Sequence, residues 1–194
     1  MKQHKRLPLA LLLVFALCIQ TLSFTSAATA LADPEPVFSA SDMTFSSGTD
    51  AVALPQSAVT QLSGLSSGTI IVDFTPTAMS TANCLFSLSN SSVTDAYFNL
   101  YIDNRGFLGL EVRNHGETRY VNLQGPAEVT RNTRHIMALS ADPQEGYKFY
   151  FDGDMVFQMP VALYELWEYD YRFMSTVNSA DVGYMGATYR NGSF

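Results

Sequence analysis

The chain contains very little cysteine: Cys18 and Cys84 are the two copies in 194 residues. Cys18 lies in an N-terminal segment with the features of a cleaved leader, and a chain that keeps Cys84 alone cannot form an intrachain disulfide. The fold must therefore be stabilised by a hydrophobic core, which a domain of this size can bury. Cys84 falls in a strand pattern, and we interpret it as a small buried hydrophobe rather than a reactive thiol.

Basic residues are also scarce. The chain has 11 lysines and arginines against 18 aspartates and glutamates. Lys2, Lys5 and Arg6 belong to the leader, which has no acidic residue, so eight basic and 18 acidic residues remain and the formal charge is −10. That charge argues against nucleic acid or an anionic membrane as the main partner.

The leader combines a basic start, an apolar stretch over residues 7–19 and the small-residue pattern Ala30-Leu31-Ala32. The apolar stretch is shorter than the roughly 20 residues of a membrane span, so a signal anchor is the weaker reading. We predict a signal peptide over residues 1–32 that is cleaved after Ala32, and a secreted or cell-surface protein with no membrane insertion after cleavage. Residues 33–40 are expected to form a linker and residues 41–194 one domain.

The sequence lacks the motifs of metal binding, nucleophilic catalysis and phosphate binding. Histidine and cysteine do not occur at metal-ligand spacing, and no nucleophile elbow or phosphate-binding glycine loop is present. We expect no cofactor, no metal site and no catalytic residue. Two alternatives stay open: calcium at Asp142, Asp152 and Asp154, which turn chemistry also explains, and a hydrolase whose carboxylates would be Glu165, Glu168 and Asp170.

The rest of the sequence predicts an all-β fold, because short alternating runs are separated by turn signals. Expected strands cover residues 70–75, 84–89, 97–103, 108–113, 118–123, 135–141, 147–151, 155–159 and 181–188. A short helical turn is expected within residues 161–174, and no long amphipathic helix. In the second run, Cys84, Phe86 and Leu88 are expected on one face.

The hairpin over residues 97–114 is the most informative segment. Its apolar residues share one parity and predict the buried face: Phe98, Leu100, Ile102, Leu108, Leu110 and Val112. Its other parity points away from the core: Tyr97, Asn99, Tyr101, Gly109, Glu111 and Arg113. We call the sheet face formed by this second set the polar face. Asn104-Arg105-Gly106 supplies the turn.

Pairing across that turn places Tyr101 opposite Gly109, Asn99 opposite Glu111 and Tyr97 opposite Arg113. An arginine can donate two parallel hydrogen bonds to a carboxylate, a glutamate can accept from hydroxyl or amide groups, and a tyrosine offers a ring face and a hydroxyl. The polar face is thus interpreted as a binding platform for a small, polar, anionic ligand. An ordinary solvated ion pair between Glu111 and Arg113 is the plainer alternative.

Seven segments in order carry a family resemblance: LSSGTIIVDF, NCLFSLSN, YFNLYI, LGLEVRN, HIMALSAD, YKFYFDGDMV and GYMGATYRNG. This series resembles the sialic-acid-binding lectin domain at the N-terminus of bacterial sialidases, carbohydrate-binding module family 40. The resemblance spans residues 40–194 and implies a concanavalin-like jelly-roll β-sandwich of antiparallel strands. The chain stops in a loop after that series, so its last strand is expected to be missing.

The resemblance also implies a site and a role. Two arginines that bind the sialic acid carboxylate correspond to Arg113 and Arg190, the glutamate of the E-x-R strand corresponds to Glu111, and a tyrosine on the preceding strand corresponds to Tyr101. The implied partners are sialylated glycans and, in the parent protein, a downstream catalytic propeller of an exo-α-sialidase. Trp167 is not in a propeller box, so the chain itself looks non-catalytic. The alternative is a laminin-G-like sandwich that binds another glycan or a protein with calcium.

Overall fold

The structure is a computed structural model that describes residues 36–41, 43–45, 50–79, 82–177 and 179–189. The predicted leader, the start of the linker and Arg190 lie outside these residues. No helix among the described residues is long and apolar enough to span a bilayer. Described residues from Pro36 onward belong to one compact unit.

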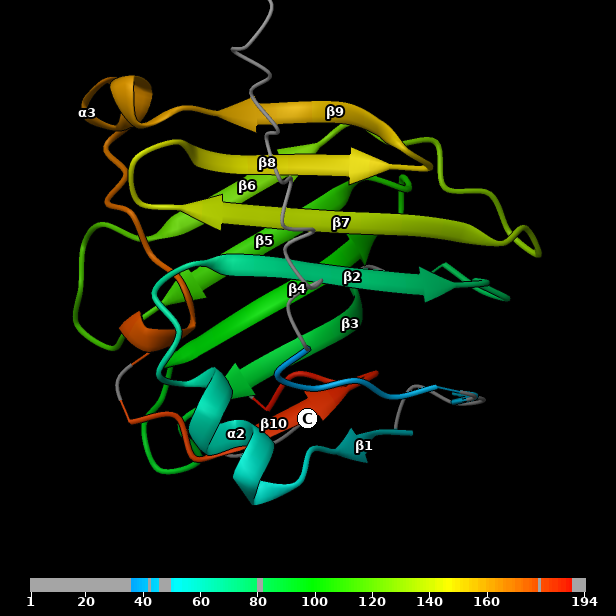
Figure 1. The fold of residues 1–194 in the computed structure, drawn as a ribbon, viewed down its shortest axis with the longest axis horizontal. Helices are drawn as coiled ribbons and strands as arrows, with labels where there is room; N and C mark the ends of the chain where they lie inside the picture. The colour runs from blue at the N-terminus through cyan, green and yellow to red at the C-terminus, as the bar shows by residue number, and fades with distance from the viewer. Residues whose placement is uncertain (1–35, 42, 46–49, 80–81, 178, 190–194) are drawn as a thin grey trace, which may run out of the picture. The chain divides into compact units, whose positions relative to one another are not determined.

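The described residues form ten strands in two antiparallel sheets, which confirms the all-β sandwich. Figure 1 shows the two sheets. The six-stranded sheet has the order β1-β10-β3-β4-β5-β6 and the four-stranded sheet the order β2-β7-β8-β9. In the six-stranded sheet the bounds are β1 Val52–Ala53, β3 Ala82–Ser89, β4 Tyr97–Asp103, β5 Leu108–Arg113, β6 Val121–Gly125 and β10 Val182–Met185. In the other sheet they are β2 Gly68–Phe74, β7 His135–Asp142, β8 Gly146–Phe151 and β9 Asp154–Met159.

The core lies between the two sheets. It contains the predicted apolar face of the β4–β5 hairpin, all of it at most 1% exposed, together with Met137, Leu139 and Phe149 from the four-stranded sheet. Phe98 makes an edge-to-face contact with Phe173, with the ring centroids 5.6 Å apart. Alternation along a strand directs every second side chain into this core and the others to the opposite face of the sheet.

Helical turns are short. The expected turn within residues 161–174 is present as the 3₁₀ turn Val161–Leu163 followed by α3, Tyr164–Trp167, with a second 3₁₀ turn at Met174–Thr176. The sequence reading missed α2, Gln56–Leu62, which packs Ala58, Val59 and Leu62 into the core. Seven residues are too few for a clear helical period, so tertiary packing rather than propensity stabilises this helix.

Three strand predictions need correction. A β-bulge between Cys84 and Phe86 shifts the register of β3, so Cys84 pairs with Tyr101 on the polar face and does not share a face with Phe86. The strand predicted from residue 118 begins at Val121, because residues 114–120 form a loop at the end of the sandwich. The late strand is shorter than predicted and ends at Met185.

His135, at the start of β7, is a structural histidine with partners on both ring nitrogens. Its Nδ1 lies 2.8 Å from Asp152 Oδ2, and its Nε2 accepts a hydrogen bond of 3.1 Å from the Thr130 backbone N–H. Thr130 Oγ1 is also 3.1 Å from Nε2. This threonine–histidine–aspartate arrangement has the order of a catalytic triad, but the backbone N–H occupies the nitrogen lone pair that a general base would need.

Candidate binding site on the polar face

The polar face is built by the β4–β5 hairpin in the predicted register. Tyr97 pairs with Arg113, Asn99 with Glu111 and Tyr101 with Gly109. Gly106 closes the turn at φ +86°, a conformation that glycine adopts without a steric penalty. Three of the four predicted site residues, Tyr101, Glu111 and Arg113, are thereby brought to one face of one sheet.

Glu111 and Arg113 form the charged centre of this face. Arg113 Nη1 lies 3.8 Å from Glu111 Oε1, and the two side chains are 30% and 15% exposed. The Tyr97 hydroxyl donates a 2.7 Å hydrogen bond to Glu111 Oε1 from a fully buried ring. Partial burial lowers the pKa of Arg113, but its hydrogen bond with Tyr97 and the charge of Glu111 outweigh that effect, so its pKa is raised and the guanidinium stays charged.

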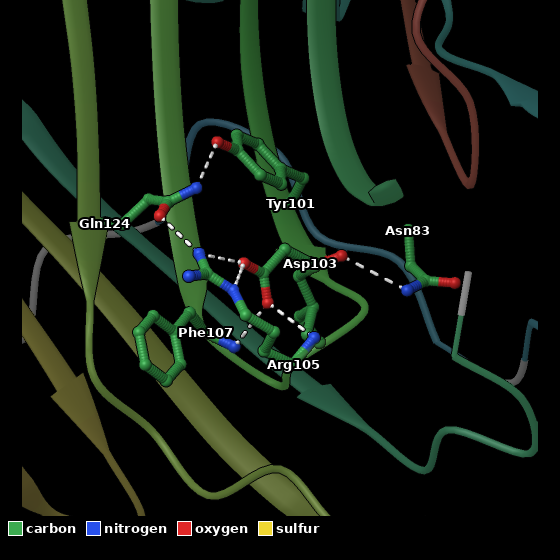
Figure 2. A network of polar contacts seen from close by, with 7 residues as sticks. Asn83, Tyr101, Asp103, Arg105, Phe107 and Gln124 are labelled. Carbon is green, nitrogen blue, oxygen red and sulfur yellow. Dashed lines mark hydrogen bonds and ion pairs between the residues drawn. The ribbon is translucent and has the colours of Figure 1, made fainter. Parts of the chain in front are cut away.

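A second set of polar contacts lies at the turn end of the same face (Figure 2). Gln124 Nε2 donates to the Tyr101 hydroxyl at 3.4 Å, while its Oε1 accepts from Arg105 Nη2 at 2.7 Å. The Arg105 guanidinium in turn donates to Asp103 Oδ2 at 2.6 and 2.8 Å. Burial is the main cause that raises the pKa of Tyr101, so its hydroxyl stays neutral at physiological pH.

Tyr101 is less accessible than the sequence implied, because it is only 8% exposed. Its ring fills the space over Gly109 on the neighbouring strand, where a Cβ would lie 2.2 Å from Tyr101 Cζ. A ligand could therefore reach little more than an edge of this ring in the present arrangement.

The C-terminal described residues cross the polar face next to the hairpin. Ser87 Oγ and Cys84 Sγ both donate to the Ala187 carbonyl, at 2.7 and 3.0 Å, and Thr188 Oγ1 donates to Asn99 Oδ1 at 2.7 Å. Tyr189 stacks on Tyr184 with the ring centroids 6.5 Å apart. Arg190, the fourth predicted site residue, lies outside the described residues.

Sequence reasoning missed one residue of this site, Tyr120. The Arg113 guanidinium lies over its ring, 4.3 Å from the centroid. The sequence carries no signal for this contact, because the β5–β6 register that brings Tyr120 opposite Arg113, one position beyond the Val112–Val121 pair, is set by the tertiary structure.

The carboxylates of the hydrolase alternative are not among the side chains of the polar face. Glu165 and Asp170 form ion pairs with Arg119, at 3.6 and 3.2 Å. In the calcium alternative, Asp142 accepts from the backbone N–H groups of Gln144 and Glu145, as its turn role predicts. Within the described ranges no three histidine, cysteine or acidic side chains are grouped as a metal site would require.

Fold and site together define an antiparallel β-sandwich with an arginine–glutamate pair on one sheet face. Residues 44–194 match the family described as the N-terminal domain of sialidases, and the chain belongs to that family. Among solved structures, the chain is similar to the CBM40 of the Ruminococcus gnavus IT-sialidase: the TM-score is 0.71 and the identity 26%, over 81% of this chain and 84% of that one.

A ligand-bound structure of the same module and one further relative extend the comparison. The same R. gnavus CBM40 has been solved bound to α2,3-sialyllactose, and this chain matches that structure with a TM-score of 0.62 and 26% identity, over 71% of this chain and 72% of that one. Anhydrosialidase of the leech Macrobdella decora is 26% identical over 136 residues, which is 66% of this chain. The matched region spans 17% of the leech protein's length.

Proposed function

We propose that this chain is a non-catalytic module that binds terminal sialic acid on glycans and targets a sialidase to them. The observation that carries the proposal is the Glu111–Arg113 pair on the polar face, in a sandwich similar to a CBM40 that has been solved with α2,3- and α2,6-sialyllactose. The laminin-G-like alternative is the weaker one, because the family match covers residues 44–194.

In this proposal Arg113 donates to the sialic acid carboxylate, and Glu111 accepts from a hydroxyl or amide of the sugar. Glu111 already holds one hydrogen bond from Tyr97, and that bond fixes the orientation of its carboxylate. Since Glu111 lies 3.8 Å from Arg113 Nη1, an incoming carboxylate would bind the guanidinium edge that faces away from it.

Arg190 would be the second arginine on the carboxylate. Its role rests on the family resemblance, and the path of the three preceding residues across the polar face supports it. Tyr101 would contact the sugar through the exposed edge of its ring.

The same proposal includes a full-length enzyme with a downstream catalytic propeller, and secretion after cleavage near Ala32. Intact-mass analysis of exported protein tests the cleavage.

The direct test is titration of the chain with 3′- and 6′-sialyllactose, with lactose as the control sugar, by calorimetry or NMR. We expect a dissociation constant of roughly millimolar to sub-millimolar, because a shallow site makes few contacts.

Arg113→Ala should abolish binding while the thermal midpoint stays close to that of the unmodified chain. Arg131→Ala is the matched control, because Arg131 is an exposed arginine in the loop between β6 and β7. Undiminished binding by Arg113→Ala would refute the assignment.

A further inference from the structure

The surroundings of Arg113 raise the question of what holds its guanidinium in place. A partly exposed arginine side chain has many rotamers, and binding a carboxylate through two parallel bonds requires one of them. Glu111 Oε1 is 3.8 Å from Arg113 Nη1, which is longer than a hydrogen bond. The Tyr97 hydroxyl forms a hydrogen bond with the guanidinium but does not cover its flat face. That face packs on the Tyr120 ring, whose centroid lies 4.3 Å from the guanidinium carbon, within the range of a cation–π contact.

Tyr120 is itself anchored on both sides in sequence. Three residues before it, Glu117 Oε2 lies 2.5 Å from Arg172 Nη1, and one residue before it, Arg119 Nη1 donates to Asp170 Oδ1 at 3.2 Å. Two residues after it, the Asn122 carbonyl accepts a 2.6 Å bond from the Tyr169 hydroxyl. All three partners come from the segment that follows α3, residues 169–172.

Arg172 is the firmest of these anchors. It is 8% exposed, and its backbone N–H donates to the Tyr147 hydroxyl, which donates back to the Arg172 carbonyl, each at 2.7 Å. Burial raises the pKa of Tyr147 well above its ordinary value, so this hydroxyl remains a donor. The loop that carries Tyr120 is therefore tied to β8 of the opposite sheet through Arg172.

We propose that Tyr120 is a positioning residue for Arg113, and that residues 169–172 set the position of Tyr120. The Tyr120 ring covers one face of the Arg113 guanidinium and restricts its rotation. The N–H edge of the guanidinium would then bind the ligand carboxylate. The proposal rests on the proposed sialic acid site and deepens it: ligand affinity depends on an aromatic ring that need not contact the ligand.

The test uses the full chain and compares Tyr120→Phe with Tyr120→Leu, with Tyr150→Leu on the outward face of β8 as the matched control. Tyr120→Phe keeps the ring and should bind 3′-sialyllactose within about twofold of the unmodified chain. Tyr120→Leu should weaken binding about three- to tenfold, the range expected for loss of a partly exposed cation–π contact. Tyr150→Leu should leave binding unchanged. Equal affinity of Tyr120→Leu and the unmodified chain would overturn the proposal, as would equal weakening by Phe and Leu.

A ligand-free readout separates this proposal from the function on which it rests. The Arg113 side-chain NMR signals should show a ring-current shift in the unmodified chain and in Tyr120→Phe, and should lose it in Tyr120→Leu. Absence of the shift in the unmodified chain would refute the stacking. If the shift is present and no sialoside binds, the proposed function fails while the geometry stands.

A second variant tests the anchor without altering either stacked residue. Glu117→Gln removes the charge that pairs with Arg172, and Glu128→Gln, at an exposed position, is its control. We expect Glu117→Gln to reduce both the ring-current shift and the affinity, by less than Tyr120→Leu does. Full retention of the shift in a folded Glu117→Gln protein would overturn the role of residues 169–172.

Discussion

The ring of Tyr101 lies directly over Gly109 on the adjacent strand, in the space where a side chain at position 109 would begin. A Cβ at that position would lie 2.2 Å from Tyr101 Cζ and 2.5 Å from both Cε atoms. Glycine in a strand interior is usually unfavourable, but here it allows a cross-strand aromatic ring to lie flat on the sheet. This contact explains why Tyr101 is nearly buried on a face that points away from the core.

Replacing Gly109 should therefore be destabilising. Gly109→Ala must displace the Tyr101 ring, and we expect a loss of about 1–3 kcal/mol, as for other overpacked sites. The control is Gly64→Ala, where the nearest atom to a new Cβ is the Gln61 carbonyl oxygen at an ordinary 3.4 Å. Urea unfolding checks both variants. Equal midpoints for Gly109→Ala and the unmodified chain would contradict the close approach.

Asp103 should make the stability depend on pH. Its carboxylate accepts from the backbone N–H groups of Arg105 and Phe107 and from the Arg105 guanidinium (Figure 2). Burial alone would raise the pKa of Asp103, but these hydrogen bonds outweigh burial and hold it below its ordinary value of 3.8. The stabilisation is thus fully present above about pH 4 and is lost as the pH falls through the lower pKa of the folded state.

Asp103→Asn should accordingly lower the free energy of unfolding by about 1–3 kcal/mol at neutral pH. The difference from the unmodified chain should shrink as the pH falls toward 3. Denaturant titrations between pH 3 and pH 7 measure it, and Asp154→Asn, an exposed aspartate on β9, serves as the control. A difference that stays constant over this range would argue against the ionised carboxylate as its source.

Cys84 should react slowly with thiol reagents. Burial raises the pKa of the thiol to about 12, so the reactive thiolate is scarce at pH 8. We expect a Cys18→Ser chain to react with a disulfide reagent promptly in urea and slowly when folded. Rapid modification of the folded protein would show that the hydrogen bond from Cys84 to the Ala187 carbonyl is broken in solution.

Several features of the fold and site could be predicted from the sequence because they are local. The β4–β5 hairpin has a strict two-residue period and a glycine turn, and these fix its register and therefore place Tyr101, Glu111 and Arg113 on one face. The Asp152-Gly153 turn has both residues at positive φ, as that pair favours.

Tertiary structure alone decided what surrounds those side chains. The bulge that turns Cys84 to the polar face interrupts a regular period, and the bonds of Ser87 and Asn99 to residues 187 and 188 join positions 100 and 89 residues apart. Tyr120 stacks on Arg113 from a loop whose Glu117 pairs with Arg172, 55 residues downstream. The two-residue period of the strands and the residues of the turn describe one hairpin. The burial of Tyr101, the anchoring of the loop that carries Tyr120 and the access of a ligand to the site arise only when segments distant in sequence pack together.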